Sequence, residues 1–197
     1  MQAPTAGPLP LQFFARDTIS VARDLLGCVL ETTLAGKITA GRIVEVEAYL
    51  GAADPAAHTY RNRKTERNAS MFGQAGTAYV YRSYGMHWCM NVVTERRGQP
   101  TAVLIRALEP LVGLDHMAIR RGLRKERTLC AGPGRLCQAL AITRQHDGRR
   151  LYRKPVRLIR PAQHGSVDIG VSGRIGVSKA ADWPLRFYDR GSPLLSR

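Results

Sequence analysis

Two glutamates separated by one residue, Glu45 and Glu47, have a spacing that could support acid–base chemistry. They lie in segment 41–51, where apolar and polar side chains alternate as in a β-strand, so that Glu45, Glu47 and Tyr49 share one face. Two carboxylates placed in this way are about 7 Å apart. At that separation an acid–base pair can activate a water molecule against a glycosidic bond. The alternative is a solvated strand face that performs no chemistry.

Aromatic side chains are concentrated in residues 79–88, although only 7% of the chain is aromatic. They are Tyr79, Tyr81, Tyr84 and Trp88. The spacing of Tyr79 and Tyr81 predicts that both lie on one face of a strand, and Tyr84-Gly85-Met86 falls where the chain should turn. An exposed Tyr and Met flanked by cations would form a wedge that enters between stacked bases. The alternative is a core cluster beneath a hairpin.

The positive charge of the chain is unevenly distributed. The formal net charge is +15, and residues 1–57 contain four cations and six anions, whereas residues 58–197 contain 26 and nine. Basic clusters occur at 61–67, 120–127 and 149–157. This pattern favours a polyanionic partner such as nucleic acid, the alternative being a solvated basic surface.

The elements that must position these groups follow from residue patterns. Runs of β-branched and aromatic residues predict strands at 28–34, 37–50, 78–81, 87–94, 101–108, 156–160 and 173–177. Helices are predicted from a cap at Asp17 or Thr18 through Leu26, and at 111–125 and 134–142. Because strands and helices do not alternate, we expect an α+β fold: a single compact domain with a curved antiparallel or mixed sheet and flanking helices.

Length and composition bound the organisation of the chain. The 197 residues predict one domain, over 13–197, preceded by a flexible proline-containing arm over 1–12. The sequence contains neither an apolar run of membrane-spanning length nor a signal-peptide pattern, so we expect a cytoplasmic protein without membrane association. Four scattered cysteines predict reduced core thiols. The histidines lack metal-ligand spacing, so neither a metal nor a cofactor is expected.

A series of motifs, in order from about Phe14 to Pro193, resembles the alkyladenine (3-methyladenine) DNA glycosylase family. The matching segments are Glu45-Val-Glu47-Ala-Tyr-Leu-Gly51, Asp54, Ala56-Ala57-His58, Arg67-Asn68, Met71-Phe72, Gly76-Thr77, Tyr79-Val-Tyr81, Tyr84-Gly85-Met86, Cys89-Met-Asn91, Arg106-Ala-Leu-Glu-Pro110, Cys130-Ala-Gly-Pro133, Leu136-Cys-Gln-Ala-Leu140 and Leu185-Arg-Phe-Tyr188. The short connection 178–182 resembles the bacterial branch of this family more than the vertebrate branch.

The resemblance implies a monofunctional base-excision repair enzyme that flips a damaged purine out of duplex DNA and hydrolyses its N-glycosidic bond. The implied substrates are 3-methyladenine, 7-methylguanine, hypoxanthine and ethenoadenine. Glu47, rather than its neighbour Glu45, would be the general base that activates water. Arg106 and a backbone carbonyl near Val177 would hold that water.

The resemblance also implies the residues that bind DNA. Tyr49, His58 and Tyr81 would line the damaged-base pocket, and Asn91 would reject guanine through its exocyclic amino group. Tyr84 would insert into the helix with support from Met86.

Phosphate contacts are expected at Arg63 and Arg67. These cations follow His58 closely in the sequence. The partner would be double-stranded DNA containing damaged purines, bound by a monomer that is nucleoid-associated if the source is bacterial.

A covalent lyase step would need a reactive amine, and no lysine lies in the pocket segments, which favours simple hydrolysis. Two alternatives remain. A non-catalytic nucleic-acid-binding module would use the same basic face, and Glu47 would then contribute little. A glycoside hydrolase would use the Glu45/Glu47 pair, although a neutral sugar gains nothing from so much positive charge.

Overall fold

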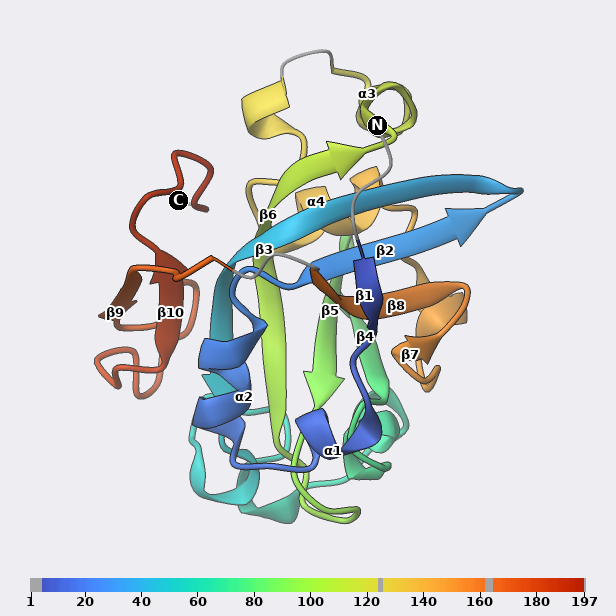
Figure 1. Cartoon of the computed structure of the whole chain (residues 1–197). Helices are drawn as coiled ribbons and strands as arrows, with labels where there is room; N and C mark the ends of the chain where they lie inside the picture. Colours follow the sequence, from blue (N-terminus) through green and yellow to red (C-terminus); the bar gives the residue numbers. More distant parts are fainter. Residues whose placement is uncertain (1–4, 124–125, 162–164, 197) are drawn as a thin grey trace.

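The computed structural model describes residues 5–123, 126–161 and 165–196. In this part of the chain ten strands form one sheet. The strands are β1 (Thr5–Pro8), β2 (Val29–Leu34), β3 (Lys37–Tyr49), β4 (Ala78–Ser83), β5 (His87–Val93), β6 (Ala102–Val112), β7 (Tyr152–Arg153), β8 (Val156–Pro161), β9 (Ile169–Ser172) and β10 (Arg186–Asp189). The main path of the sheet is β1-β8-β2-β3-β6-β5-β4, its pairs are antiparallel, and it curls strongly (Figure 1).

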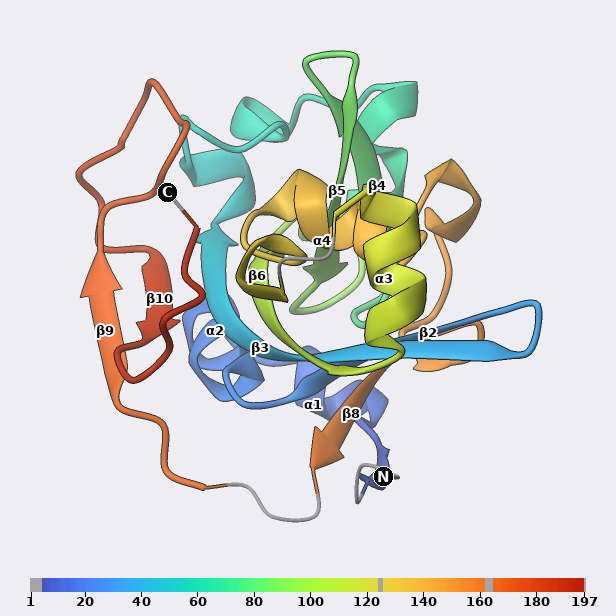
Figure 2. The same ribbon diagram turned by 90° about the horizontal axis from the view of Figure 1, so that it is seen from above.

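Short helices connect and cover these strands. The α-helices are α1 (Leu11–Phe14), α2 (Thr18–Leu25), α3 (Leu114–Arg121) and α4 (Pro133–Ala139), and the 3-10 helices are η1 (Gly51–Ala53), η2 (Tyr60–Asn62), η3 (Glu66–Phe72), η4 (Glu126–Thr128) and η5 (Arg144–His146). Helix α2 packs on β3, whereas α4 packs on β5 and β6 from the opposite side, with α3 beside it (Figures 1 and 2). Apolar side chains of α2, α4 and the intervening strands form one buried core. The predicted α+β class and single compact domain are confirmed.

Strand β3 matches its prediction closely and carries the two glutamates. It pairs with β6 along one edge, and with β2 and then β10 along the other. Register shifts on either side of Glu45 interrupt the pairing with β6. Residues 43–48 are all buried, so both faces of the strand are covered here. A simple solvated strand face is therefore excluded for Glu45 and Glu47.

Of the predicted elements, two differ most from the structure. The helix predicted from residue 111 begins at Leu114, because β6 continues to Val112 and Gly113 breaks the strand with a φ of 76°. The strand predicted at 173–177 is wrong: β9 ends at Ser172, and the following residues form a loop. In that loop the backbone of Ile175 bonds to the side chains of Glu47 and Arg106 instead of to a neighbouring strand.

The N-terminal segment joins the sheet. Within the predicted arm, Thr5–Pro8 pairs with β8, and Leu9 is fully buried with its N–H donated to the Leu158 carbonyl at 2.9 Å. Residues 1–4 of that arm lie outside the described residues. From Thr5 onward, therefore, the predicted arm is packed against the rest of the domain and is not separate from it.

All four cysteines are buried and unpaired. Burial raises the pKa of Cys28 and of Cys130 to about 12, so both stay protonated thiols near neutral pH. Among the described residues, no helix is long and apolar enough to cross a membrane.

Candidate active site

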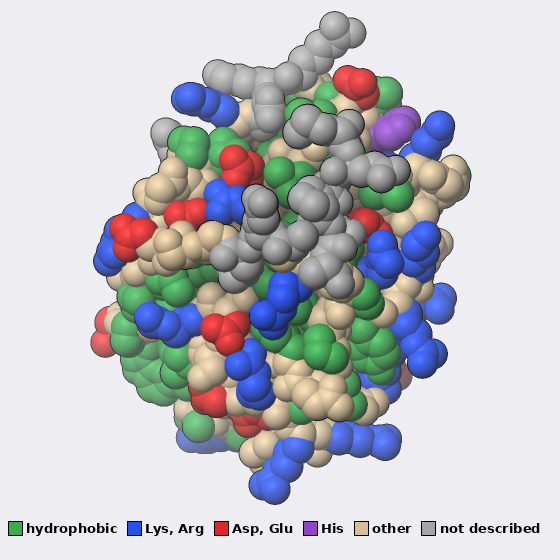
Figure 3. Space-filling model, viewed as in Figure 1, with side chains coloured by type: hydrophobic (Ala, Val, Ile, Leu, Met, Phe, Trp, Pro, Cys, Tyr) green, Lys and Arg blue, Asp and Glu red, His purple; other side chains and the backbone are tan. Residues whose placement is uncertain are grey.

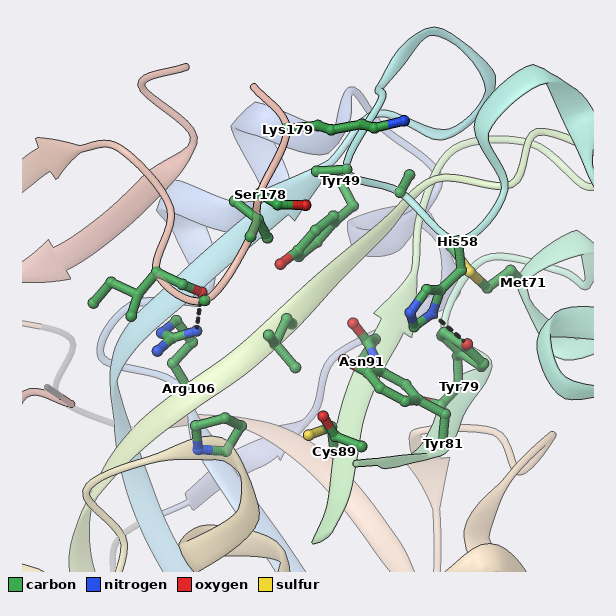
Figure 4. A pocket seen from close by; sticks show the side chains of 18 of the residues that line it. Tyr49, His58, Met71, Tyr79, Tyr81, Cys89, Asn91, Arg106, Ser178 and Lys179 are labelled. Atoms are coloured by element: carbon green, nitrogen blue, oxygen red, sulfur yellow. Dashed lines mark hydrogen bonds between the residues drawn. The ribbon is translucent and has the colours of Figure 1, made fainter. Parts of the chain in front are cut away.

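A cavity of about 680 Å³ opens where β3, the β4–β5 hairpin, β6 and two loops meet (Figure 4). Its lining includes Tyr49 at the end of β3, residues 55–58 between η1 and η2, and Leu104 and Arg106 on β6. Residues 175–179 close it from the C-terminal side. The sheet thereby brings together side chains that are far apart in the sequence.

One wall of the cavity is aromatic. The ring of Tyr81 stacks on that of Tyr79 with centroids 5.2 Å apart, and His58 meets Tyr81 edge-on at 4.6 Å. His58 Nδ1 lies 2.8 Å from the hydroxyl of Tyr79, which fixes the imidazole (Figure 4). Burial and the nearby charge of Arg67 lower the pKa of His58, so the ring is neutral near pH 7. A neutral imidazole does not repel a cationic ligand.

Tyr49 lies on the other side of the cavity from His58 and Tyr81 (Figure 4). Its hydroxyl donates a hydrogen bond of 2.9 Å to Glu47 Oε2, and the Arg174 guanidinium lies 4.8 Å from its ring centroid. Burial, together with the charge of Glu47, raises the pKa of Tyr49, so the phenol remains a hydrogen-bond donor. Aromatic rings thus lie on both sides of the cavity.

Glu47 does not line the cavity itself, but it bonds to three residues that do, Tyr49, Arg106 and Ile175. Its side chain is fully buried, and its Oε1 accepts a hydrogen bond of 2.7 Å from the Ile175 N–H and lies 3.1 Å from Arg106 Nη1. The same Nη1 donates to the Ile175 carbonyl at 3.4 Å (Figure 4). Burial lowers the pKa of Arg106, but Glu47 and Glu45 outweigh this effect and raise it above its ordinary value, so the guanidinium stays charged.

The backbone group at this centre belongs to Ile175 rather than to Val177. Val177 lines the cavity, but the hydrogen bonds to Glu47 and Arg106 come from the residue two positions earlier. The water-holding carbonyl expected near Val177 stays a prediction, and Ile175 becomes a second candidate for it. Sequence spacing could not distinguish the two, because the loop is not the strand that we expected.

Glu45 has different surroundings from Glu47. Its Oε1 accepts hydrogen bonds from Arg106 Nε at 3.0 Å, Arg186 Nε at 2.7 Å and Ser196 Oγ at 2.7 Å. Its Oε2 accepts from the Ser196 N–H at 2.5 Å. Neither glutamate lines the cavity itself, but every partner of Glu47 named above does, whereas of the partners of Glu45 only Arg106 does. The geometry fits an anchoring carboxylate rather than a reacting one.

Asn91 is held on the cavity floor by its neighbour across the β4–β5 hairpin. Its Nδ2 donates to the Tyr79 carbonyl at 3.1 Å, and the side chain is almost fully buried. Because this bond uses one amide hydrogen, the orientation of the amide toward the cavity is fixed (Figure 4).

The tip of the same hairpin is exposed. Tyr84 is 85% and Met86 67% exposed, and the Met86 N–H closes the turn on the Ser83 carbonyl at 3.0 Å. Tyr84 and Gly85 have φ of 49° and 67°, the backbone of a type I′ turn. A large apolar side chain raised at the cavity rim, where Tyr84 lies, fits a wedge better than a core residue.

The cations expected to contact phosphate differ in their surroundings. Arg63 and Arg67 are both exposed. Arg67 lines the cavity, donates to the Arg82 carbonyl at 3.0 Å and has its guanidinium 5.2 Å from the Tyr81 ring centroid. It therefore ties the hairpin to η3 as well as offering positive charge at the rim.

The basic cluster at 149–157 is partly internal. Arg150 bonds to Thr77, and Arg157 bonds to Glu31 at 3.0 Å. Arg153 and Lys154 remain exposed. Lys and Arg side chains gather on the right of Figure 3, the side on which Figure 1 labels β7 and β8. In the cluster at 120–127, residues 124 and 125 lie outside the described residues.

Three contributors to the site were not recognised in the sequence. Lys179, on the loop after Ile175, is exposed at the cavity rim (Figure 4), so the expectation that no lysine lies near the pocket is wrong. Arg174 and Asp54 form a fully buried ion pair with bonds of 2.5 and 2.9 Å. Burial raises the pKa of Asp54, but the bonds from Arg174 and two backbone N–H groups outweigh it and lower that pKa.

Among the described residues, no three His, Cys, Asp or Glu side chains are grouped as metal ligands would be. Aromatic rings, the Asn91 amide and the Arg106 guanidinium are among the groups that line the cavity, together with the cations Arg67 and Lys179 at its rim.

Comparison with known proteins places this geometry in context. Residues 12–193 match a family model described as methylpurine-DNA glycosylase. A protein of Methanoculleus marisnigri named "Putative 3-methyladenine DNA glycosylase" is 53% identical over 196 residues, covering 96% of this chain and 98% of its own. Proteins with the same name from Rhodopseudomonas palustris (strain HaA2) and Nitrosospira multiformis are 50% and 49% identical, covering 100% and 93% of this chain and 96% and 91% of their own lengths.

Proposed function

Since this chain belongs to the methylpurine-DNA glycosylase family, and is thus a DNA glycosylase, we propose that it excises alkylated and deaminated purines from duplex DNA by simple hydrolysis. The proposed substrates are 3-methyladenine, 7-methylguanine, hypoxanthine and ethenoadenine. The observation that carries the proposal is the buried Glu47–Arg106 pair, whose arginine lines an aromatic cavity of about 680 Å³.

The aromatic walls supply the recognition. A purine flipped into the cavity would lie between Tyr49 and the rings of His58 and Tyr81. An alkylated purine is positively charged, so the π faces attract it more than a normal base, and the neutral His58 adds no repulsion. Asn91, whose amide orientation is fixed by Tyr79, would reject the exocyclic amino group of guanine. Selectivity would also come from the lower cost of extruding damaged or mispaired bases.

The hydrolysis needs one base and one way to hold water. Glu47 would take a proton from the water while the water oxygen bonds to C1′ of the sugar, and the C1′–N bond would break with its electron pair leaving on the purine. Arg106, whose Nη1 lies 3.1 Å from Glu47 and donates to the Ile175 carbonyl, would orient that water together with this carbonyl. A neutral lesion such as hypoxanthine would also have to be protonated as it departs, and should react more slowly.

Binding of the duplex would use the exposed parts of the site. Tyr84, supported by Met86, would fill the gap that the flipped nucleotide leaves, and Arg63 and Arg67 would contact phosphates. We include in the proposal a monomer that works in the cytoplasm without a cofactor and without a lyase step. The presence of Lys179 at the rim makes the absence of a lyase step a point to test directly.

The test is single-turnover base release from a duplex carrying one 3-methyladenine or one hypoxanthine. Wild type is compared with Glu47→Gln, which keeps the shape of the side chain, and with Glu66→Gln, an exposed glutamate on η3. Glu47→Gln should bind the duplex normally and release base about 10²–10⁴-fold more slowly, whereas Glu66→Gln should match wild type. Strand cleavage by wild type that disappears in Lys179→Gln would contradict simple hydrolysis.

A different outcome would favour the alternative function. If wild type binds the damaged duplex but releases no base, the chain acts as a nucleic-acid-binding module. The buried carboxylate would then have a structural role.

A further inference from the structure

The guanidinium of Arg106 is held along two separate edges. Its Nη1 faces Glu47 and the Ile175 carbonyl, as described above. Its Nε and Nη2 face the other way and donate to the hydroxyl of Ser196, at 3.2 and 3.0 Å. Nε also donates to Glu45 at 3.0 Å. One edge thus serves the reacting carboxylate, and the other is bound by Ser196 and Glu45.

The hydroxyl of Ser196 is fully used. A serine hydroxyl can donate one hydrogen bond and accept two. Here it donates to Glu45 Oε1 at 2.7 Å and accepts the two bonds from Arg106. The Ser196 N–H adds a bond of 2.5 Å to Glu45 Oε2. Such a complete set orients the guanidinium plane more strictly than an ion pair alone would.

Charge balance in this cluster favours a fixed arrangement. Glu45 and Glu47 are fully buried, and the side chains of Arg106 and Arg186 are 6% and 12% exposed. Two carboxylates therefore face two guanidinium groups in a poorly solvated environment. If Ser196 did not hold Nε and Nη2, Arg106 could turn toward the more heavily bonded Glu45 and away from Glu47.

We propose that Ser196, acting with Glu45, is a positioning residue that orients Arg106 for its work at Glu47. The proposal rests on the proposed function for the role of Arg106, but the orientation itself is a separate property of the protein. Ser196 does not line the cavity and would act only through Arg106.

The experiment compares Ser196→Ala with Ser192→Ala in the full chain. Both serines are 7% exposed and lie in the same C-terminal segment, but the Ser192 hydroxyl bonds to the Leu194 N–H rather than to the catalytic pair. Ser196→Ala should slow single-turnover base release by between about ten-fold and about 100-fold, because a displacement near 1 Å has that effect. The affinity for a duplex with an abasic analogue should change less than two-fold, roughly the scatter of such assays. Ser192→Ala should match wild type in both measurements.

A second pair of variants isolates the hydroxyl. Ser196→Thr keeps the hydroxyl and should restore most of the rate. Ser196→Val has the shape of threonine without the hydroxyl and should remain slow. Equal rates for Thr and Val, or a Ser196→Ala enzyme as fast as wild type, would overturn the proposal.

The orientation of the Arg106 guanidinium can also be measured by NMR, without an activity assay. The ¹⁵N NMR signal of the Arg106 Nε–H, identified by its loss in Arg106→Lys, should shift and exchange faster with solvent in Ser196→Ala and not in Ser192→Ala. If wild type releases no base but this signal responds, the positioning stands and the proposed function fails. An unchanged signal in Ser196→Ala overturns the positioning whatever the activity.

Discussion

The buried ion pair between Asp54 and Arg174 should be one of the most sensitive points of the molecule. Asp54 accepts bonds from both terminal nitrogens of Arg174 and from the N–H groups of Leu50 and Ala56. Both side chains of the pair are fully buried. Asp54→Asn keeps the volume of the side chain. Its amide hydrogens would face the N–H groups that now donate to Asp54, and the Arg174 cation would lose its countercharge. Breaking a buried pair in this way costs about 3–5 kcal/mol.

The control is a matched exposed pair. Asp168 bonds to Arg190 at 2.7 Å, but these side chains are 70% and 56% exposed. Asp168→Asn should therefore cost less than about 1 kcal/mol. Urea unfolding of the two variants gives the two free energies directly. For a domain of this size, the loss in Asp54→Asn corresponds to a fall in Tm of about 6–20 °C.

The pH dependence has a definite sign. The pKa of Asp54 is lowered in the folded chain, so the unfolded state binds the proton more tightly. The stability that Asp54 provides is present above the unfolded pKa of about 4 and is lost as pH falls below it through the folded value. The difference in stability between wild type and Asp54→Asn should therefore narrow below about pH 4. A loss in Asp54→Asn within about 1 kcal/mol of that in Asp168→Asn would refute the reasoning.

Two further predictions concern DNA binding. Tyr84→Ala removes the exposed wedge, so it should slow excision of well-paired lesions more than of mispaired ones, as measured by single-turnover release; equal losses on both duplexes would argue against a wedge. Arg63→Gln should weaken duplex binding and reduce the slope of log K against log salt by about 1. Lys37→Gln, at the first residue of β3 and at the opposite end of the strand from the cavity, should leave that slope unchanged. A slope for Arg63→Gln equal to that of wild type would exclude a phosphate contact at Arg63.

Local patterns predicted strand β3 and the shared face of Glu45 and Glu47 correctly, because alternation along a strand depends only on neighbouring residues. What covers that face could not be predicted. Ile175 and Ser196 reach the two carboxylates from 128 and 151 residues further along the chain. The resemblance to a family named Glu47, but the structure was needed to show that all bonded partners of Glu47 line the cavity while only one partner of Glu45 does.

The loop after β9 shows why the prediction of a strand at 173–177 failed. Its β-branched residues have strand propensity, yet the chain there is fixed by side chains from other elements and by a close approach of Gly173 to the Ala181 carbonyl. Propensity does not contain such contacts. In this loop the Ile175 backbone bonds to Glu47 and Arg106, and Lys179 lies at the cavity rim, which a regular strand at 173–177 does not predict.

Because of the way in which β9 and β10 join the sheet, activity should be lost on heating before the central sheet unfolds. β10 is attached to β3 through three residue pairs, and β9 pairs with β10 beside the main path of the sheet (Figure 1). Elements with few neighbours open at a fraction of the global unfolding free energy. Such an opening would withdraw Arg186 from Glu45 while the central strands stay paired. The temperature at which activity is lost would then measure the opening of the β9–β10 pair, whereas the calorimetric transition would measure the unfolding of the core.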